Sequence, residues 1–548
     1  MNEVDKIYTD LVKDIHTNGY SDKGEEVRAK YSDGEPAYCK SVFGKQIEFN
    51  EGVIPLLTGK KVFTKTAIKE MILFWVKQTV KEQDFKDDKV KIWDEWFRNG
   101  SLGRSYAYQF ESHRHHVRDT IKVVPVRKTK HGDLTDVIVG EKLEVNKECN
   151  DPIVGNTYTN SFGKSFTVID VYKGGEYRNN LMVAKVQFHT TNNIVEAYKS
   201  HVVKAKVMDN YARTFFGVGY MGDYQSVKNY TKEELTYLKK LWRGMLTRCY
   251  SERQGSYKNY GKKGVFVDPR WHSFENFIRD IRYLPNFFIA RDKMFKGFEL
   301  DKDYYGSNCY SKETCVWLTK QENLIYSRCK PFKLYKDDEC LGTFLSAKQV
   351  GLDFGFHGTS LTRVLKGSIE SIKGFTAKYI EDDGYLYRYQ LSRNQVVDLI
   401  NNIKNNPMSK RLLTSFWNDA DVGKKVLQEC AWSTNWRVAG DKLELILIQR
   451  SGDIGLGIPF NWFQYKVLQL MVAHATGLKP GKFIHQVANL HYYDRHEETL
   501  LEQCNNKTYD PPTITINKDV VDFFDFTVDD ITVSGYVCGD YLPMDVAI

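Results

Sequence analysis

The sequence predicts an α/β protein of the α+β type, in which a mixed sheet with packed helices is split in sequence by an inserted α+β module. Strand-like and helical segments mix in both terminal parts of the 548-residue chain. The middle differs from both ends in composition, and it alone is strongly basic. A chain of this length is also too long for one ordinary domain. We therefore expect several units, with the two ends forming one of them.

The terminal parts supply the elements of the split domain. Apolar residues at helical spacing predict helices over residues 1–20, 62–80, 391–411 and 461–478. The pair Asn406-Pro407 ends the third of these helices, and Gly477 closes the fourth. Alternating apolar residues predict strands over residues 442–453, 513–521 and 526–536.

The middle of the chain has its own pattern of elements. Residues 120–208 show strand-like alternation, and residues 231–250 and 274–283 are predicted helices. Residues 333–380 predict a short strand, a helix, a tight turn and a second helix. The predicted parts are a split domain over 1–111 and 387–548, a β-rich part over 112–230, a third part over 231–330 and a helical repeat over 331–386.

Charge and composition narrow the class of protein. Residues 112–386 hold 44 Lys and Arg against 32 Asp and Glu, a formal charge of +12, while the two ends together carry −4. Such a contrast favours a module that faces a polyanion, although a merely basic solvated surface would have the same charge. The 42% hydrophobic content excludes global disorder, collagen and coiled coil. With no membrane-length apolar run, no signal-like start and ten cysteines without a CxxC pair, we expect a reduced, cytoplasmic protein with no membrane partner.

The C-terminal part contains one dense group of chemically active residues. Cys430 lies in VLQECAWSTNW, followed by QRSGDIGLGIPFNWFQY (449–465) and HYYDRH (491–496). A single cysteine is usually a small buried hydrophobic residue. Here, however, the loop–helix unit that follows the cysteine contains a guanidinium, a hydroxyl, a carboxylate and an amide. An arginine lowers the pKa of a thiol and binds phosphate through two hydrogen bonds, and an amide can read the edge of a uracil-like base.

Further segments join this group in a recognisable order. They are IPLLTGKKVFTKTAIKEMILFW (54–75), IWDEW (92–96), LGRSYAYQF (102–110), NPMSKR (406–411), FDFTVDDITVSGY (524–536) and YLPMDVAI (541–548). Through both terminal parts the chain thus resembles the thymidylate synthase family. The resemblance implies the thymidylate synthase fold, a homodimer, and conversion of dUMP to dTMP with 5,10-methylenetetrahydrofolate as co-substrate.

The resemblance also implies a role for individual residues. Cys430 would add to C6 of dUMP, and Arg450 would hold the phosphate and activate the thiol. Glu70 would organise water and relay protons, and Tyr106 and Asp453 would complete the catalytic group. Further dUMP contacts are implied for Lys410 and Arg411 (both toward the partner subunit's site), Gln449, Ser451, Asn461, His491 and Tyr493. The folate side would be formed by Trp93, Trp96, Asp453 and the C-terminal Ile548.

The sequence also departs from the family pattern around the pyrimidine. Ala431, Asn435 and Arg495 replace the family's histidine, glutamine and asparagine, and Lys410 replaces an arginine. The phosphate loop is replaced near residues 33–40 by DGEPAYCK, which leaves its arginine unplaced, with Arg28 as the one candidate. A sister reaction therefore stays open, in which water rather than hydride completes the product and 5-hydroxymethyl-dUMP forms.

The middle resembles phage HNH-type homing endonucleases. The resemblance rests on LWRGMLTRCYSE (241–252), NYGKKGVFVDPRWHSFENFIRDI (259–281) and ELDKDYYGSNCYSKETCVWLTKQENL (299–324). It implies a ββα unit in which Asp301, Asp303 and Asn323 serve a divalent cation such as Mg²⁺, although the usual histidine base is absent. The alternative is that the two aspartates cap a turn and Asn323 is an ordinary helix residue.

Residues 340–380 resemble the small DNA-recognition repeat that is often joined to such nucleases. SAKQVGLDF leads through a glycine turn into SLTRVLKG, which has the spacing of a helix-turn-helix with Thr362, Arg363 and Lys366 available to DNA. A plain pair of packed helices is the alternative. The combination implies a bacteriophage protein that works in the host cytoplasm. In a third hypothesis the insert disables the synthase, and the chain is a DNA-binding nuclease.

Overall fold

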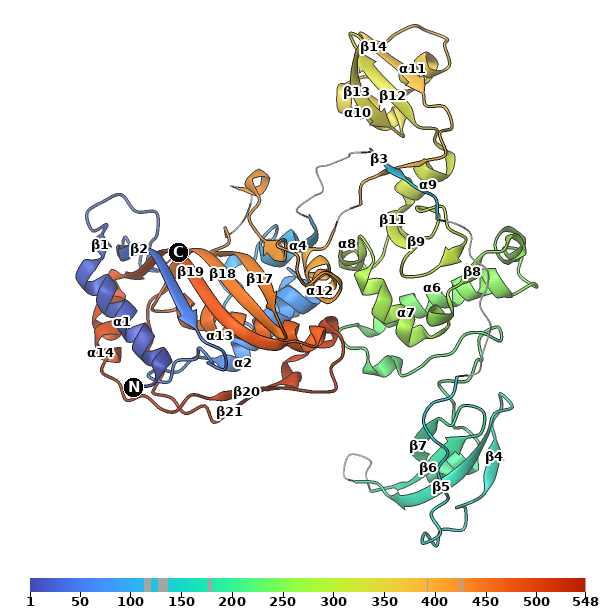
Figure 1. The fold of residues 1–548 in the computed structure, drawn as a ribbon, viewed down its shortest axis with the longest axis horizontal. Helices are drawn as coiled ribbons and strands as arrows, with labels where there is room; N and C mark the ends of the chain where they lie inside the picture. Colours follow the sequence, from blue (N-terminus) through green and yellow to red (C-terminus); the bar gives the residue numbers. More distant parts are fainter. Residues whose placement is uncertain are drawn as a thin grey trace. The chain divides into compact units, whose positions relative to one another are not determined.

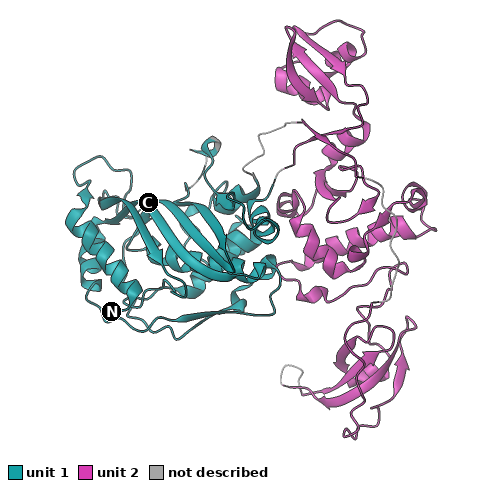
Figure 2. Cartoon of the chain, viewed as in Figure 1, with its two compact units in different colours: residues 1–116, 392–548 teal, residues 117–391 magenta. Residues whose placement is uncertain are grey.

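The computed structural model describes residues 1–112, 120–126, 137–175, 180–391, 393–422, 425 and 427–547. The chain divides into two compact units, shown in Figure 2. Unit 1 consists of residues 1–116 and 392–548, and unit 2 of residues 117–391. The unit boundaries therefore fall after residues 116 and 391. The boundaries predicted from the sequence, after residues 111 and 386, each lie five residues earlier.

Unit 1 is built on a six-stranded mixed sheet (Figure 1). Its strands, in spatial order, are β1 (Tyr20–Ser21), β2 (Cys39–Phe49), β19 (Lys479–Tyr493), β18 (Lys442–Asp453), β17 (Ala431–Ala439) and β16 (Leu413–Ser415). Only β18 and β19 run parallel. A parallel pair needs a crossover, and α13 (Gly457–Thr476) supplies it. The parallel pairing also brings the carboxyl ends of both strands to the same edge of the sheet.

Helices cover one face of this sheet. The crossover helix α13 is buried along most of its length and ends at Gly477, whose φ of 72° suits glycine. It packs against β18, β19 and α2 (Thr64–Met71), which continues through a π-helical turn, Ile72–Lys77. The remaining helices include α1 (Glu3–Asn18), α3 (Glu82–Asp87), α12 (Gln395–Asn405) and α14 (Glu497–Gln503). The four predicted helices are confirmed, whereas the last two predicted strands are shorter, as β20 (Thr513–Ile516) and β21 (Ile531–Ser534).

The two sequence segments of unit 1 are joined by their own contacts beside the junctions. Gln395, at the start of α12, donates from Nε2 to the carbonyl of Gln109 (2.9 Å), in the short helix α4 (Gln109–Ser112). Its Oε1 accepts from the Ser415 amide (2.7 Å), and Asn394 donates to Gln78 (2.6 Å). These hydrogen bonds close unit 1 without any residue of unit 2.

Unit 2 begins with a β-rich part. Strands β4 (Thr157–Thr159), β5 (Ser165–Lys173), β6 (Met182–Phe188) and β7 (Ile194–Tyr198) form an antiparallel meander, followed by α5 (Lys199–Val203). Its core contains Phe166, Val186 and Phe188. In contrast, β3 (Thr120–Val123) pairs with β15 (Leu386–Tyr389) and not with this meander. The second junction therefore lies after β15, because β15 completes its pairing inside unit 2.

The rest of unit 2 contains the predicted helices and further strands. They are α6 (Lys232–Tyr250), β8 (Phe266–Val267), α7 (Phe274–Asp280), α8 (Phe287–Asp292), β9 (Phe298–Asp301), β10 (Cys309–Tyr310), β11 (Val316–Thr319) and α9 (Lys320–Arg328). Strands β9 and β11 are antiparallel, and β11 leads directly into α9, which gives a ββα arrangement with β10, paired to β8, inserted between β9 and β11 in the chain. A capping box of Thr319 and Glu322 fixes the start of α9.

The last part of unit 2 is a three-stranded sheet with two helices. The elements are β12 (Phe332–Lys336), β13 (Glu339–Phe344), α10 (Ala347–Phe354), α11 (Gly358–Leu365) and β14 (Phe375–Tyr379). The predicted helix pair is present, and the structure adds two strands to the one that the sequence predicts. Across the part of the chain that the structure describes, none of the helices combines the length and apolar character that a membrane span needs.

Candidate active site

A pocket of about 410 Å³ lies at the carboxyl edge of the parallel strands in unit 1. Strands β18 and β19 contribute Arg450, Ser451, His491 and Tyr493, all four of which were predicted from the sequence. Their alignment follows from the register, which pairs Ser451 with Asn489 and Asp453 with His491. The remaining lining residues are Asp22, Val27, Arg28, Ala29, Ala37, Cys39 and Asn489.

Arg450 connects this pocket to the segment that carries Cys430. Its Nε donates to the Glu429 carbonyl and its Nη2 to the Gln428 carbonyl, both at 2.9 Å. The backbone amide of Arg450 donates to the Cys430 carbonyl, also at 2.9 Å. The same Nη2 lies 3.6 Å from the Cys430 sulfur. One guanidinium thus fixes the backbone before the cysteine and places positive charge on its thiol.

Two thiols lie near the pocket, and their electrostatic surroundings differ. Burial raises the pKa of Cys430, and Arg450 and Arg28 oppose that rise while Glu429 adds to it. Burial raises the pKa of Cys39 to about 12, and the carboxylate of Asp22, 3.0 Å from its sulfur, contributes to the rise. Since the thiolate is the nucleophile, Cys430 is the better placed of the two.

The loop before β2 overlaps residues 33–40, where the sequence departs from the family's phosphate loop, and contains Arg28, the candidate for the missing arginine. Arg28 is exposed and lines the pocket opposite the β18 and β19 residues. With Arg450 and Ser451 it gives the pocket two guanidinium groups and one hydroxyl, a set that suits phosphate. The loop carries no motif that would have singled out Asp22 or Cys39. Only the place of Cys39 at the start of a strand beside β19 reveals its position.

Glu70 lies in α2, on the helix side of the site. Burial raises the pKa of Glu70 to about 7, and interactions with Gln464 and Trp93 partly offset the rise. Gln464 in turn accepts a hydrogen bond from Asn461 Nδ2 (3.3 Å). Glu70 and the predicted base-reading Asn461 are therefore linked through one glutamine. A carboxyl group with a pKa near neutrality is suited to accept and release protons.

Aromatic side chains stand beside Glu70. Tyr106 stacks on Phe74 (centroids 5.1 Å apart), and Trp93 meets both rings edge-on at 5.4 Å. The Trp93 indole is buried, and its interaction with Glu70 is one of those that lower the Glu70 pKa. Trp96 is partly exposed, and its side chain was predicted for the same region. Tyr106 has a φ of 44°, and its amide donates to Glu429 at 2.9 Å.

Asp453 ends β18 close to two histidines. Its Oδ1 accepts from the Gly455 amide (2.7 Å) and lies 3.9 Å from His496 Nδ1. His491 is buried, which lowers its pKa, while the Asp453 charge opposes the shift. The ring of His491 meets that of Tyr493 edge-on at 5.3 Å. In the strand register Asp453 pairs with the pocket residue His491, but it is not itself among the residues that line the pocket.

Four predicted dUMP contacts are not among the residues that line the pocket: Asn461, Gln449, Lys410 and Arg411. Gln449 is buried, and its amide is engaged by the Ser451 carbonyl (2.8 Å) and by His485 Nε2 (3.0 Å). Because Trp462 donates to His485 Nδ1, the neutral histidine carries its proton on Nε2 and donates to Gln449. Lys410 and Arg411 are exposed in the turn after α12. The predicted folate contact Ile548 lies outside the described residues.

The three residues predicted for a nuclease site have other partners. Asp301 accepts from the Tyr304 amide (2.7 Å), Asp303 pairs with Lys302, and Asn323 donates to Glu299 (2.7 Å). Burial, with the charge of Asp303, raises the pKa of Asp301 to about 6. The turn-capping alternative is thus present for Asp301. Within the described ranges, no group of three or more His, Cys, Asp or Glu side chains is arranged to hold a metal ion.

Of the residues predicted to face DNA, Thr362 and Arg363 lie on α11, and Lys366 is the residue that caps its C-terminal end. Arg363 and Lys366 are exposed, and Thr362 is partly buried with its hydroxyl donating to the Gly358 carbonyl (3.1 Å). The turn between α10 and α11 begins at Gly355, whose φ is 72°. Leu361 and Val364 on the opposite side of α11 pack into the core. The two basic side chains are therefore presented by a helix whose apolar side is fixed.

The fold and the site together define a mixed-sheet protein in which one arginine lines a pocket and contacts the segment that carries Cys430. The thymidylate synthase family profile matches residues 6–149 and 318–548, more than half of the chain. The chain belongs to the thymidylate synthase family. The stretch between the two matched segments lies inside unit 2.

Individual relatives agree with this assignment. Thymidylate synthase of Bacillus mojavensis is 38% identical over 175 residues, and that of Bacillus phage phi3T is 39% identical over 175 residues. In both cases the aligned part is 30% of this chain and 63% of the relative, so the chain spans less than two thirds of these relatives' length. The solved structure of thermostable thymidylate synthase A from Bacillus subtilis aligns over 100% of both chains with 20% identity and a TM-score of 0.47.

Proposed function

We propose that unit 1 is a thymidylate synthase that converts dUMP to dTMP with 5,10-methylenetetrahydrofolate through a covalent adduct on Cys430. The observation that carries the proposal is the arrangement of Arg450, which binds the backbone before Cys430, lies 3.6 Å from its sulfur and also lines the pocket. Family membership supports the same reading.

The pocket residues suggest how dUMP is held. Arg28, Arg450 and Ser451 would bind the phosphate, and His491 and Tyr493 on β19 would reach the sugar. Asn461, oriented by Gln464, would read the polar edge of the uracil. The Cys430 thiolate would then add to C6, which makes C5 nucleophilic. Glu70, with a pKa near 7, would take up and return protons through water.

The aromatic residues beside Glu70 fit a flat folate ring system. The buried Trp93 and the partly exposed Trp96 offer flat aromatic surface. Asp453, at the end of β18, offers a carboxylate acceptor. When bound, 5,10-methylenetetrahydrofolate supplies the one-carbon unit and the reducing hydride. Trp93, Trp96 and Asp453 would hold it and keep bulk water from C5.

Turnover of dUMP tests this proposal against its closest alternative. The full-length chain, given dUMP and 5,10-methylenetetrahydrofolate, is expected to release dihydrofolate, because a synthase uses the folate as reductant. A dUMP hydroxymethylase would release tetrahydrofolate instead. The departures at Ala431, Asn435 and Arg495 keep that alternative open, and the release of tetrahydrofolate would favour it.

Glu70→Gln is expected to lower turnover by about 10²-fold, because a positioned acid–base group contributes that much or more. The wild-type rate should rise as the pH passes through about 7, since the Glu70 carboxyl must ionise before it can accept a proton. The variant should lack this inflection. The measurement is kcat against pH, with Glu82→Gln, at a partly exposed glutamate, as control. A wild-type-like profile in Glu70→Gln would remove Glu70 from the proton path.

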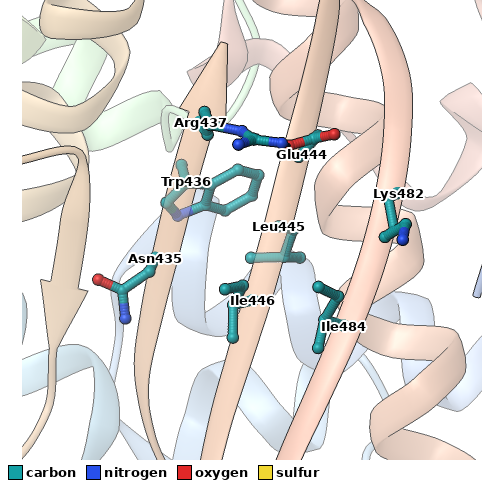
Figure 3. A pocket seen from close by; sticks show the side chains of 8 residues that line it. All are labelled: Asn435, Trp436, Arg437, Glu444, Leu445, Ile446, Lys482 and Ile484. Carbon is teal, nitrogen blue, oxygen red and sulfur yellow. Dashed lines mark hydrogen bonds and ion pairs between the residues drawn. The ribbon is translucent and has the colours of Figure 1, made fainter. Parts of the chain in front are cut away.

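The open face of the sheet supports a homodimer. Figure 3 shows side chains of β17, β18 and β19 around a shallow pocket of about 370 Å³ on this face. The register aligns Asn435, Ile446 and Ile484 across the three strands, and Arg437 pairs with Glu444 beside them. We propose that a second copy covers this face, and that its Lys410 and Arg411 reach the site.

Replacing Ile446 and Ile484 with Lys together should therefore convert the dimer to monomers, because two buried charges would face each other across the symmetric contact. Sedimentation velocity measures the change. Thr515→Lys, on the exposed strand β20, is the control and should leave the dimer intact. A wild-type chain that sediments as a monomer at micromolar concentration would contradict the proposal.

For unit 2 we propose DNA binding through α11. The supporting observations are the exposed Arg363 and Lys366 on a helix with a fixed apolar side, and the +12 charge of residues 112–386. Affinity for duplex DNA should fall steeply with salt, because phosphate contacts release counterions. Replacing Arg363 and Lys366 with Ala together should reduce the slope of log K against log salt by about two, and Lys173→Ala should not. Salt-insensitive binding would contradict this picture.

The ββα order of β9, β11 and α9 keeps an HNH-type nuclease as a second candidate for unit 2. Its test is nicking of supercoiled DNA with Mg²⁺, by the wild type and by Asp303→Ala. Cleavage that Asp303→Ala abolishes would support the nuclease. Cleavage that Asp303→Ala leaves undiminished would remove this site from consideration.

A further inference from the structure

A buried ion pair lies directly before Cys430. The Lys425 ammonium is 2.9 Å and 2.7 Å from the two oxygens of Glu429, and these side chains are 1% and 0% exposed. Gln428 Nε2 also donates to Glu429 (3.1 Å). A buried carboxylate is costly unless it is paired and hydrogen-bonded, and here it is both. The resemblance to the thymidylate synthase family implies no role for Lys425 or Glu429.

The same carboxylate binds a second segment of unit 1. Glu429 Oε1 accepts from the backbone amide of Tyr106, 2.9 Å away. Tyr106 has a left-handed backbone (φ 44°), which is unfavourable for a tyrosine and needs support from its surroundings. Next to it, Ser105 Oγ donates to the Leu427 carbonyl (2.9 Å). Glu429 thus ties the residues before the nucleophile to the segment that places Tyr106.

Three charged groups act on the Cys430 thiol. Arg450 on β18 and Arg28 in the pocket loop favour its thiolate, while Glu429 disfavours it. The phenols of Tyr106 and Tyr493 also face the thiol. Lys425 pairs with Glu429 and also faces Asp421. The ionisation of Cys430 therefore depends on this pair as well as on Arg450.

We propose that Glu429 is a positioning residue for Cys430: its buried carboxylate, held by Lys425, fastens the backbone before Cys430 to the Tyr106 amide and sets the local charge that the thiol meets. Its effect on dUMP turnover rests on the function proposed above. Its effect on the thiol can be measured without any nucleotide.

The test is the rate of alkylation of Cys430 by iodoacetamide as a function of pH, with the modified peptide identified by mass spectrometry. Glu429→Gln keeps an oxygen for the Tyr106 amide and removes the negative charge. Because a nearby negative charge disfavours the thiolate, the midpoint of the rate–pH curve should fall by about one pH unit. Glu82→Gln is the matched control, since Glu82 pairs with Lys86 at the same i,i+4 spacing on the surface. Its midpoint should equal that of the wild type.

A second variant distinguishes the effect of the lost charge from an effect of misfolding. The double change Lys425→Met and Glu429→Gln leaves no unpaired buried charge, and its midpoint should also lie below that of the wild type. If both Glu429 variants alkylate with the wild-type midpoint, the proposal is wrong, even if they react more slowly. If the midpoints move but the wild type makes no product from dUMP, the proposed function fails and the role of Glu429 stands.

Discussion

Cys430→Ala is expected to abolish nucleotide turnover and to leave DNA binding by unit 2 unchanged. Without the sulfur no covalent bond to C6 can form, and the loss should exceed about 10³-fold, as for other enzymes that lose their nucleophile. Arg450 would keep its hydrogen bonds to the Gln428 and Glu429 carbonyls, so the pocket should keep its shape. The measurement is the rate of product formation from dUMP.

Two comparisons make the Cys430 result specific. Cys340→Ala changes an exposed cysteine on β13 and should retain full turnover. A dUMP analogue that carries fluorine at C5 should stop the reaction at the covalent stage, before dihydrofolate forms. The trapped adduct should map to the Cys430 peptide. An adduct mapped to Cys39, the second thiol at the pocket, would falsify the assignment of the nucleophile.

Arg450→Ala is expected to have the second largest effect, a loss of about 10²- to 10³-fold in kcat/KM, the range that follows removal of one preorganised donor. Three interactions disappear together: the hydrogen bonds to the Gln428 and Glu429 carbonyls, the positive charge beside the Cys430 sulfur, and a guanidinium at the phosphate end of the pocket. Alkylation of Cys430 should also need a higher pH, because Arg450 no longer favours the thiolate.

Two comparison variants, Arg450→Lys and Arg393→Ala, make the Arg450→Ala result specific. Lysine keeps the charge but cannot bind two carbonyls and approach the thiol in one planar fork, so it should recover only part of the activity. Arg393, which pairs with Asp398 at the start of α12, is exposed, and its loss should have little effect. Full activity in Arg450→Ala would contradict the role given to the guanidinium.

The strand residues of the site were predicted from the ordered segments that resemble the thymidylate synthase family, and the strand register explains why they meet. Arg450 and Ser451 end an alternating strand, and His491 and Tyr493 end another, so parallel pairing alone brings them together. The loop over residues 22–37 has no such pattern, and only the folded chain shows that Arg28 reaches the pocket. The partners of Glu429 were equally hidden, because Lys425 and Tyr106 meet it through tertiary contacts.

Burial explains where the prediction and the structure differ. Gln449 precedes Arg450 on a strand whose residues alternate between the two faces, so its side chain points into the core and binds His485. In unit 2 the helix pair was predicted from a glycine turn and two apolar patterns, whereas the added strands β13 and β14 are short and largely polar outside their core contacts. The junction after β15 depends on pairing with β3, more than 250 residues earlier in the chain, which no local pattern indicates.

Unit 1, although interrupted in sequence, is expected to methylate dUMP. The hydrogen bonds from Gln395 and Asn394 to Gln109 and Gln78 close the unit beside its junctions, and we therefore expect activity in the full-length chain. The most direct measurement is the mass of the nucleotide that this chain makes from dUMP and 5,10-methylenetetrahydrofolate. The expected product is heavier than dUMP by one methylene group. A product that carries a hydroxymethyl group, or unchanged dUMP, would contradict this expectation.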